Sequence, residues 1–125
     1  MMGFMTDDTL VVVADDLSCP LFRRADGRYA DEPQGRIKLL NMAGKIIGTG
    51  PCAHGVVVGD GKLAYVQHDP AEKPLYSLDG RTWSPGMPAT FDGSGSLLII
   101  DENRDLTDTR GRLVAHNVFA AYWTR

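Results

Sequence analysis

The sequence predicts an all-β fold of antiparallel hairpins: a small sandwich, a barrel, or a partial propeller of two to three blade-like repeats. The apolar runs are short, turn-forming residues recur between them, and 125 residues suffice for one domain but not for two. Hydrophobic residues make up 43% of the chain and charged residues 23%, as in ordinary folded domains. We therefore expect residues 1–125 to form one all-β domain that begins with a flexible N-terminal segment, residues 1–8.

Short extended segments can be placed in order along the chain. The first is the apolar, β-branched run 10–14, which is typical of a buried strand. Paired segments then follow at 21–24 and 28–30, 37–40 and 45–48, 56–58 and 63–66, and 75–77 and 82–83. Asp-Gly pairs begin at Asp26, Asp60, Asp79 and Asp92, and each can supply the positive φ angles of a tight turn because glycine has no Cβ.

The C-terminal stretch 113–123 is long enough to form a helix. Its apolar residues fit a helical period, but valine and the aromatic residues favour strands. We expect residues 113–125 to form a C-terminal strand that docks on its own domain or on a neighbouring subunit.

Parts of the chain read as an internal repeat. The strand 10–13 is followed by Pro-Leu-aromatic at 20–22 and Asp-Gly-Arg at 26–28, and the strand 63–66 is followed by the same patterns at 74–76 and 79–81. A third, degraded copy begins at 97–100 and continues to 110–113. The offset near fifty residues between the first two copies is typical of a repeat of three or four strands. Because gaps are needed to align the copies, chance similarity is the alternative.

The second copy carries a family resemblance. Residues 59–83 resemble an Asp-box (BNR-like) repeat, as found in sialidase-like propellers and in phage or bacterial surface proteins. The pattern is carried by five residues, with one residue fewer between Asp and Gly than in the sialidase version: Ser77, Asp79, Gly80, Thr82 and Trp83. The resemblance implies a structural hairpin turn in which the Ser and Asp side chains satisfy backbone donors and Trp packs under the turn. It does not imply a catalytic element.

The length of the chain limits how far this resemblance extends. A propeller blade needs about 40 residues and a closed ring at least about four blades. Either several copies close one ring, or the chain is a small sandwich or barrel with a similar turn. An open set of blades would leave unpaired strand edges, which promote association. Both alternatives predict a homo-oligomer.

The N-terminus and the cysteines bear on the compartment. The first residues carry no cationic flank, and Asp7 and Asp8 interrupt them before an apolar secretory core. We expect a protein made in the cytoplasm without a signal peptide, and kept there or packaged into a virion. In a reducing cytosol the two cysteines, Cys19 and Cys52, are expected to remain free thiols.

Two groups of residues are candidate metal ligands. The side chains of Asp101, Asn103, Asp105 and Asp108 are spaced like the start of a calcium loop, although the loop positions for Gly and Glu hold other residues. The alternative is an acidic, solvated hairpin. Cys52, His54 and His68 fit zinc poorly, because zinc sites usually show two close ligand pairs.

Catalysis has little support in the sequence. A triad could be assembled from His54, His68 or His116, but only if one of them met a carboxylate in a pocket. No Gly-x-Ser-x-Gly motif surrounds a serine. We therefore predict a protein that is not an enzyme and needs no cofactor, with a small hydrolase as the last alternative.

Binding is the function that the sequence favours. Tyr76, Tyr122 and Trp123 could offer flat faces to a sugar ring or a protein partner, whereas Trp83 is expected in the core. A net charge of −3 argues against nucleic-acid binding, and the apolar runs are too short for membrane insertion. The leading hypothesis is a homo-oligomeric structural or attachment protein of a phage virion, such as a tail, fibre or decoration protein. A lectin-like carbohydrate-binding module is the alternative.

Overall fold

The computed structural model of the chain describes residues 2–6, 9–16, 18–19, 35–59, 61–69, 71 and 73–121. The described residues form strands and turns without a helix, so the all-β prediction is confirmed. In this part of the chain, no helix is long and apolar enough to cross a membrane.

The strands form three antiparallel sheets that follow one another along the chain. The first contains β1 (Met2–Thr6), β2 (Thr9–Ala14), β3 (Gly35–Leu40) and β4 (Ile46–Ala53). The second contains β5 (Gly55–Gly59), β6 (Lys62–His68), β7 (Pro74–Ser77) and β8 (Ser84–Pro85). The third contains β9 (Met87–Phe91), β10 (Leu97–Ile100), β11 (Leu106–Asp108) and β12 (Leu113–Ala115). In every sheet each strand pairs with the next one in the sequence, so every sheet is a meander.

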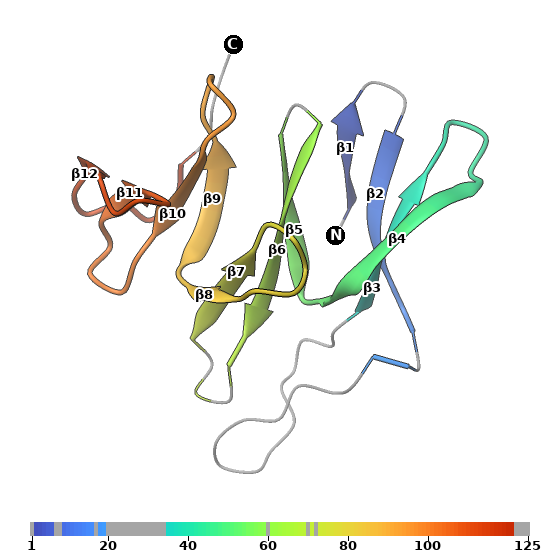
Figure 1. Cartoon of the computed structure of the whole chain (residues 1–125), viewed down its shortest axis with the longest axis horizontal. Helices are drawn as coiled ribbons and strands as arrows, with labels where there is room; N and C mark the ends of the chain where they lie inside the picture. The colour runs from blue at the N-terminus through green and yellow to red at the C-terminus, as the bar shows by residue number, and fades with distance from the viewer. Residues whose placement is uncertain are drawn as a thin grey trace.

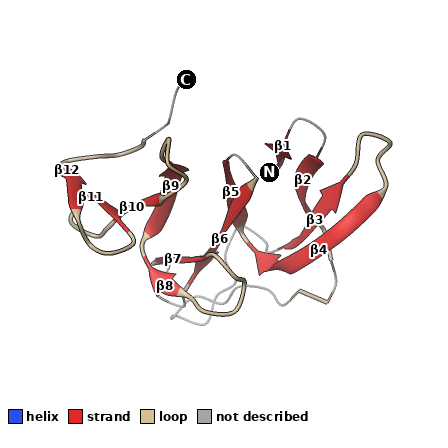
Figure 2. Ribbon diagram, turned by 45° about the horizontal axis from the view of Figure 1, so that its top comes forward, coloured by secondary structure: helices blue, strands red, loops and turns tan. Residues whose placement is uncertain are grey.

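The three sheets lie side by side along the longest axis of the molecule (Figure 1). The first strands of neighbouring sheets are in contact, because β5 touches both β1 and β9. The view of Figure 2 shows the same succession of three layers. This arrangement matches the predicted hairpin-rich antiparallel sandwich, and none of the described sheets closes into a barrel.

The middle sheet carries apolar residues on both of its faces. Successive side chains of a strand point to opposite faces, and β5 shows this directly. Val56 packs with Val11 and Ile37 of the first sheet. Val57, the next residue, packs against a second cluster that includes Phe91 and Leu97 of the third sheet. The core is therefore two thin apolar layers, one on each side of the second sheet.

One five-residue turn recurs in all three sheets. Its first residue is Asn41, Asp69, Asp92, Asp101 or Asp108, whose Oδ1 accepts the backbone N–H groups two and four residues further on, at 2.9–3.0 Å. The backbone N–H of the first residue also donates to the carbonyl of the fifth. Where it is described, the fourth residue has a positive φ: Gly44, Gly95, Arg104 and Gly111.

The predicted Asp-Gly turns are confirmed in part. Gly61, in the connection between β5 and β6, has a φ of 80°, and Gly80 has a φ of 77°. At Asp92 a turn is present, but its left-handed residue is Gly95 and not Gly93. The pair at Asp26 lies outside the described residues.

The three copies of the predicted internal repeat begin at equivalent positions in the three sheets. They begin in β2, β6 and β10, each of which is the second strand of its sheet. The offsets are unequal because the first sheet has a long connection, residues 15–34, between its second and third strands. The third strand of the first sheet is β3, and the Pro-Leu-aromatic segment at 20–22 lies outside the described residues.

The two ends of the chain differ from the prediction. Residues 2–6, expected within a flexible segment, form β1 and pair with β2. At the other end, β12 covers the first three residues of the expected strand 113–125, and residues 116–121, the rest of its described part, continue without strand structure. Tyr122 and Trp123 lie outside the described residues.

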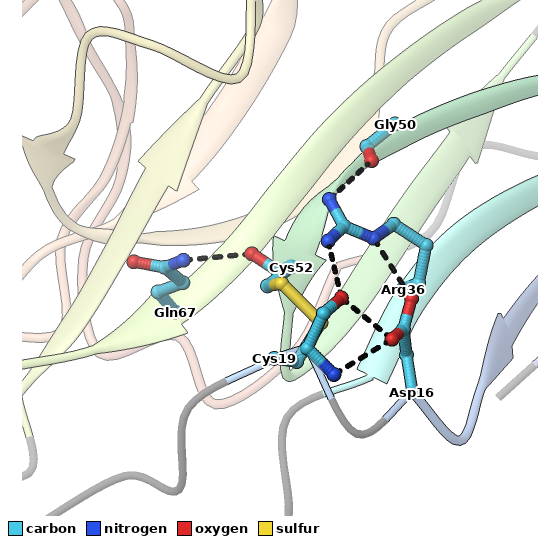
Figure 3. The surroundings of a disulfide bond; sticks show 7 residues. Asp16, Cys19, Arg36, Gly50, Cys52 and Gln67 are labelled. Carbon is cyan, nitrogen blue, oxygen red and sulfur yellow. Dashed lines mark hydrogen bonds and ion pairs between the residues drawn. A yellow bond between two sulfur atoms is a disulfide. The ribbon is translucent and has the colours of Figure 1, made fainter.

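The prediction of free thiols was wrong, because Cys19 and Cys52 form a disulfide with their Cα atoms 5.6 Å apart (Figure 3). The sheet register explains why they meet. Ala14, Arg36 and Cys52 lie opposite one another across β2, β3 and β4. The chain that leaves β2 therefore emerges at the same end of the sheet as Cys52, with only β3 between them. An argument from the redox compartment does not reveal this proximity.

Candidate functional site

The loop between β7 and β8 contains the predicted structural turn. Ser77 is only 1% exposed, and its Oγ donates to Asp79 Oδ1 at 3.0 Å while accepting the Gly80 N–H at 2.8 Å. Asp79 Oδ1 also accepts the N–H groups of Arg81 and Thr82, both at 2.8 Å. The backbone N–H groups of Thr82 and Arg81, followed by the Ser77 hydroxyl, lower the pKa of Asp79 from 3.8 to about 2.

This turn also joins two sheets. A Cβ on Gly80 would lie 3.1 Å from a side-chain carbon of Pro51 in β4, so the turn packs closely on the first sheet. Trp83 is half-buried. The hydrogen bonds are those expected of a structural turn, in which Ser and Asp satisfy backbone donors. Membership of the Asp-box family stays a prediction.

The carboxylates of three of the four predicted calcium ligands, Asp101, Asp105 and Asp108, have other partners. Oδ1 of Asp101 accepts the backbone N–H groups of Asn103 and Asp105, which closes the turn between β10 and β11. Oδ1 of Asp105 lies 2.8 Å from His116 Nδ1. Asp108 closes the next turn in the same way as Asp101. Among the described residues no group of three or more His, Cys, Asp or Glu could hold a metal ion, so the structure favours the acidic hairpin.

The three histidines make two separate contacts, one between two histidines and one between a histidine and a carboxylate. The rings of His54 and His68 meet edge to face, with centroids 4.8 Å apart. Since Cys52 is in the disulfide, its sulfur is not a thiolate ligand, and the zinc hypothesis for these three residues is not supported. His116 meets the carboxylate of Asp105, but its side chain is 68% exposed and lines neither of the two cavities described next.

A cavity of about 680 Å³ lies between the second and third sheets; we call it the cationic cavity. Its polar wall comes from turns: Lys62 after the β5–β6 turn, Gly95 and Ser96 in the β9–β10 turn, and 108–112 in the β11–β12 turn. Its apolar wall consists of Leu63, Leu78, Phe91 and Leu97. The β5–β6 and β9–β10 turns lie at the same end of their sheets (Figure 1).

A second, apolar groove of about 330 Å³ also lies between these two sheets. Its apolar lining includes Leu75, Met87, Ile100 and Phe119. The guanidinium of Arg104 lies 4.5 Å from the centre of the Phe119 ring, a cation–π contact. At the rim, an ion pair of 3.1 Å between Lys73 and Glu102 links the second sheet to the third.

The predicted binding aromatics do not form a described site. Tyr76 is half-buried and packs against the cluster that contains Phe91. Tyr122 and Trp123 lie outside the described residues. Sequence reasoning missed both cavities, because each combines residues from turns far apart in the chain. Two arginines around Gly111 are a local signal for the cationic cavity, but the sequence does not show that they face Lys62.

No protein-family model, curated protein or solved structure matches this chain. Functional inference therefore depends on the geometry of the chain itself.

Proposed function

We propose that the protein is a non-enzymatic structural or attachment protein that acts as a homo-oligomer. Exposed apolar residues on two edge strands carry this proposal. Ile46 and Ile47 on β4 are 50% and 55% exposed, and Leu113 and Val114 on β12 are 47% and 49% exposed. These strands are the edges of the first and third sheets and lie at opposite ends of the longest axis (Figure 1).

Two different apolar edges at opposite ends favour head-to-tail association. An edge strand offers unpaired backbone groups to another chain, and exposed apolar side chains add a reason to bury it. A contact between two different surfaces generates a ring if its rotation closes, and a filament if it does not. Both forms suit a component of a larger particle. A phage virion, with the protein as a tail, fibre or decoration component, is the setting suggested by the resemblance of residues 59–83.

The test is sedimentation velocity on two single variants and their mixture. Ile47→Lys alters the β4 edge, and Val114→Lys alters the β12 edge. We expect an oligomeric wild type and a monomer for each variant. An equimolar mixture should form a dimer of one copy of each, because one intact β4 edge and one intact β12 edge remain. Met42→Lys is the control, since Met42 is 72% exposed but lies in the β3–β4 turn. A monomeric wild type would contradict the proposal.

A second candidate is a small lectin-like carbohydrate-binding module. The observation that favours it is the cationic cavity, whose volume lies within the range typical of ligand sites. Hydroxyl, ammonium and guanidinium groups line it together with aliphatic side chains, and a sugar presents both hydroxyl groups and an apolar ring face. Binding on a glycan array would support this function, and an array without any binding would remove it.

A further inference from the structure

We propose that the cationic cavity binds the acidic group of a carboxylated or sulfated glycan. This inference rests on the carbohydrate-binding function proposed above and names its ligand class. It is independent of the association of edge strands, because Ile46, Ile47, Leu113 and Val114 do not line the cavity.

The charge of the cavity differs from that of the whole chain. The protein has a net charge of −3, yet the lining contains Lys62, Arg110 and Arg112 against a single carboxylate, Asp108. Both oxygens of that carboxylate have partners. Oδ1 accepts the N–H groups of Arg110 and Arg112 at 2.9 Å, and Oδ2 lies 3.5 Å from Arg112 Nε. The cavity therefore attracts anions although the molecule as a whole repels them.

Arg110 is the group best placed to bind an acidic ligand. Its backbone N–H belongs to the turn, and its positive charge helps to lower the pKa of Asp108, but its guanidinium makes no direct hydrogen bond or ion pair with another described residue. A guanidinium offers five donors in a planar fork that matches a carboxylate or sulfate. Lys62 is held nearby by a 2.9 Å hydrogen bond from its Nζ to the Gly95 carbonyl. The cationic groups are therefore displayed by closed turns, which reduces the entropy lost on binding.

The rest of the lining favours a sugar over other anions. Leu78 is 53% exposed and offers an aliphatic surface to the face of a sugar ring, and Ser96 and Thr109 offer hydroxyl groups. Phe91 is only 6% exposed, so it does not present a face on which a nucleobase could stack. The polar wall consists of turns, whereas extended peptides usually pair with a free strand edge.

The test is titration calorimetry with defined oligosaccharides. The probes are a hyaluronan tetrasaccharide for a carboxylate, a chondroitin 4-sulfate tetrasaccharide for a sulfate, and neutral chitotetraose. Each is measured at about 20 mM and about 200 mM sodium chloride, because screening weakens ionic contacts. We expect at least one acidic probe to bind, more weakly at the higher salt, and chitotetraose not to bind. Tetraglutamate is included as an acidic peptide.

Arg110→Gln should weaken binding of the acidic probe about tenfold to a hundredfold, the range for a lost hydrogen bond to a charged group. Lys45→Gln makes the same change of charge in a turn of the first sheet and should leave the affinity unchanged. Three results would overturn the inference: no acidic probe binds, chitotetraose binds equally well, or Arg110→Gln has no effect. Tighter binding of tetraglutamate would overturn the glycan class. If neutral glycans bound on the array and acidic glycans bound no better, the lectin function would be supported and this inference would be rejected.

Discussion

The disulfide should supply a large share of the stability of the fold. We consider the double variant Cys19→Ser, Cys52→Ser, which leaves no lone thiol. The two cysteines are 33 residues apart in the sequence. In the chain-entropy account, opening a loop of this length gives the unfolded chain enough freedom to lower the free energy of unfolding by about 3–4 kcal/mol. Since small domains are stable by about 5–15 kcal/mol in total, this loss is substantial.

The folded state should survive the substitution, because other contacts hold the same region (Figure 3). Arg36 Nε donates to Asp16 Oδ2 at 3.2 Å, and Gln67 Nε2 donates to the Cys52 carbonyl at 2.7 Å. Neither contact involves a sulfur atom. The main effect should therefore be on the unfolded ensemble, which becomes more expanded, so the denaturant dependence of unfolding should increase.

The assay is urea unfolding followed by tryptophan fluorescence, with a thermal melt in parallel. The variant should lose about 3–4 kcal/mol and melt about 10–15 °C lower. Wild type in a phosphine reductant should match the variant, while the reductant should leave the variant unchanged. Equal stability of the variant and oxidised wild type, within about 0.5 kcal/mol, would refute the reasoning.

Three further predictions concern the turns. Ser77→Ala should lower the free energy of unfolding by about 1–3 kcal/mol, since the Gly80 N–H loses its acceptor in a buried position; an unchanged urea midpoint would contradict this. The pKa values of Asp79 and Asp16 are lowered to about 2, so their stabilising effect should be complete above about pH 4 and lost as the pH falls through 2. Asp79→Asn should flatten acid unfolding monitored by circular dichroism, and an unaltered acid profile would argue against this role. Gly44→Ala should cost about 1–2 kcal/mol through its positive φ alone, because nothing lies within 4 Å of the added Cβ; a melt unchanged from wild type would count against that.

Local turn chemistry was the most predictable part of the structure. The left-handed glycines Gly61 and Gly80 follow from Asp-Gly pairs between apolar runs, since only nearby residues decide a positive φ. At Asp92 the Asp-Gly pair indicates the wrong left-handed residue. The turn there spans five residues, and its left-handed residue is the fourth, a glycine three positions after the Asx residue. That spacing also fits the turn at Asn41, which the paired segments 37–40 and 45–48 already predict, and it would have indicated the turn at Asp108.

The features that depend on distant pairing were not predictable from one sequence. The strand β1 exists through its register with β2, although its own residues lie in a segment interrupted by acidic residues. The disulfide needs the alignment of three strands, and the cationic cavity needs Lys62 beside Arg110. The spacing behind the calcium hypothesis raises a related point. Spacing alone does not show that Asp101 and Asp108 accept backbone N–H groups of two different turns.

In the recurring five-residue turn, the first residue stabilises the fold, whereas the side chains at the third and fifth positions are available for contacts at the surface. Its hydrogen bonds join the first side chain to backbone N–H groups, so they do not specify the side chains at the third and fifth positions. In one turn these positions hold Arg110 and Arg112, which line the cationic cavity. In another the fifth is Lys73, which pairs with Glu102 of the neighbouring sheet. Rigid elements that present variable side chains are how many binding proteins are built. For the same reason Arg110→Gln should change recognition without changing the turn that displays it.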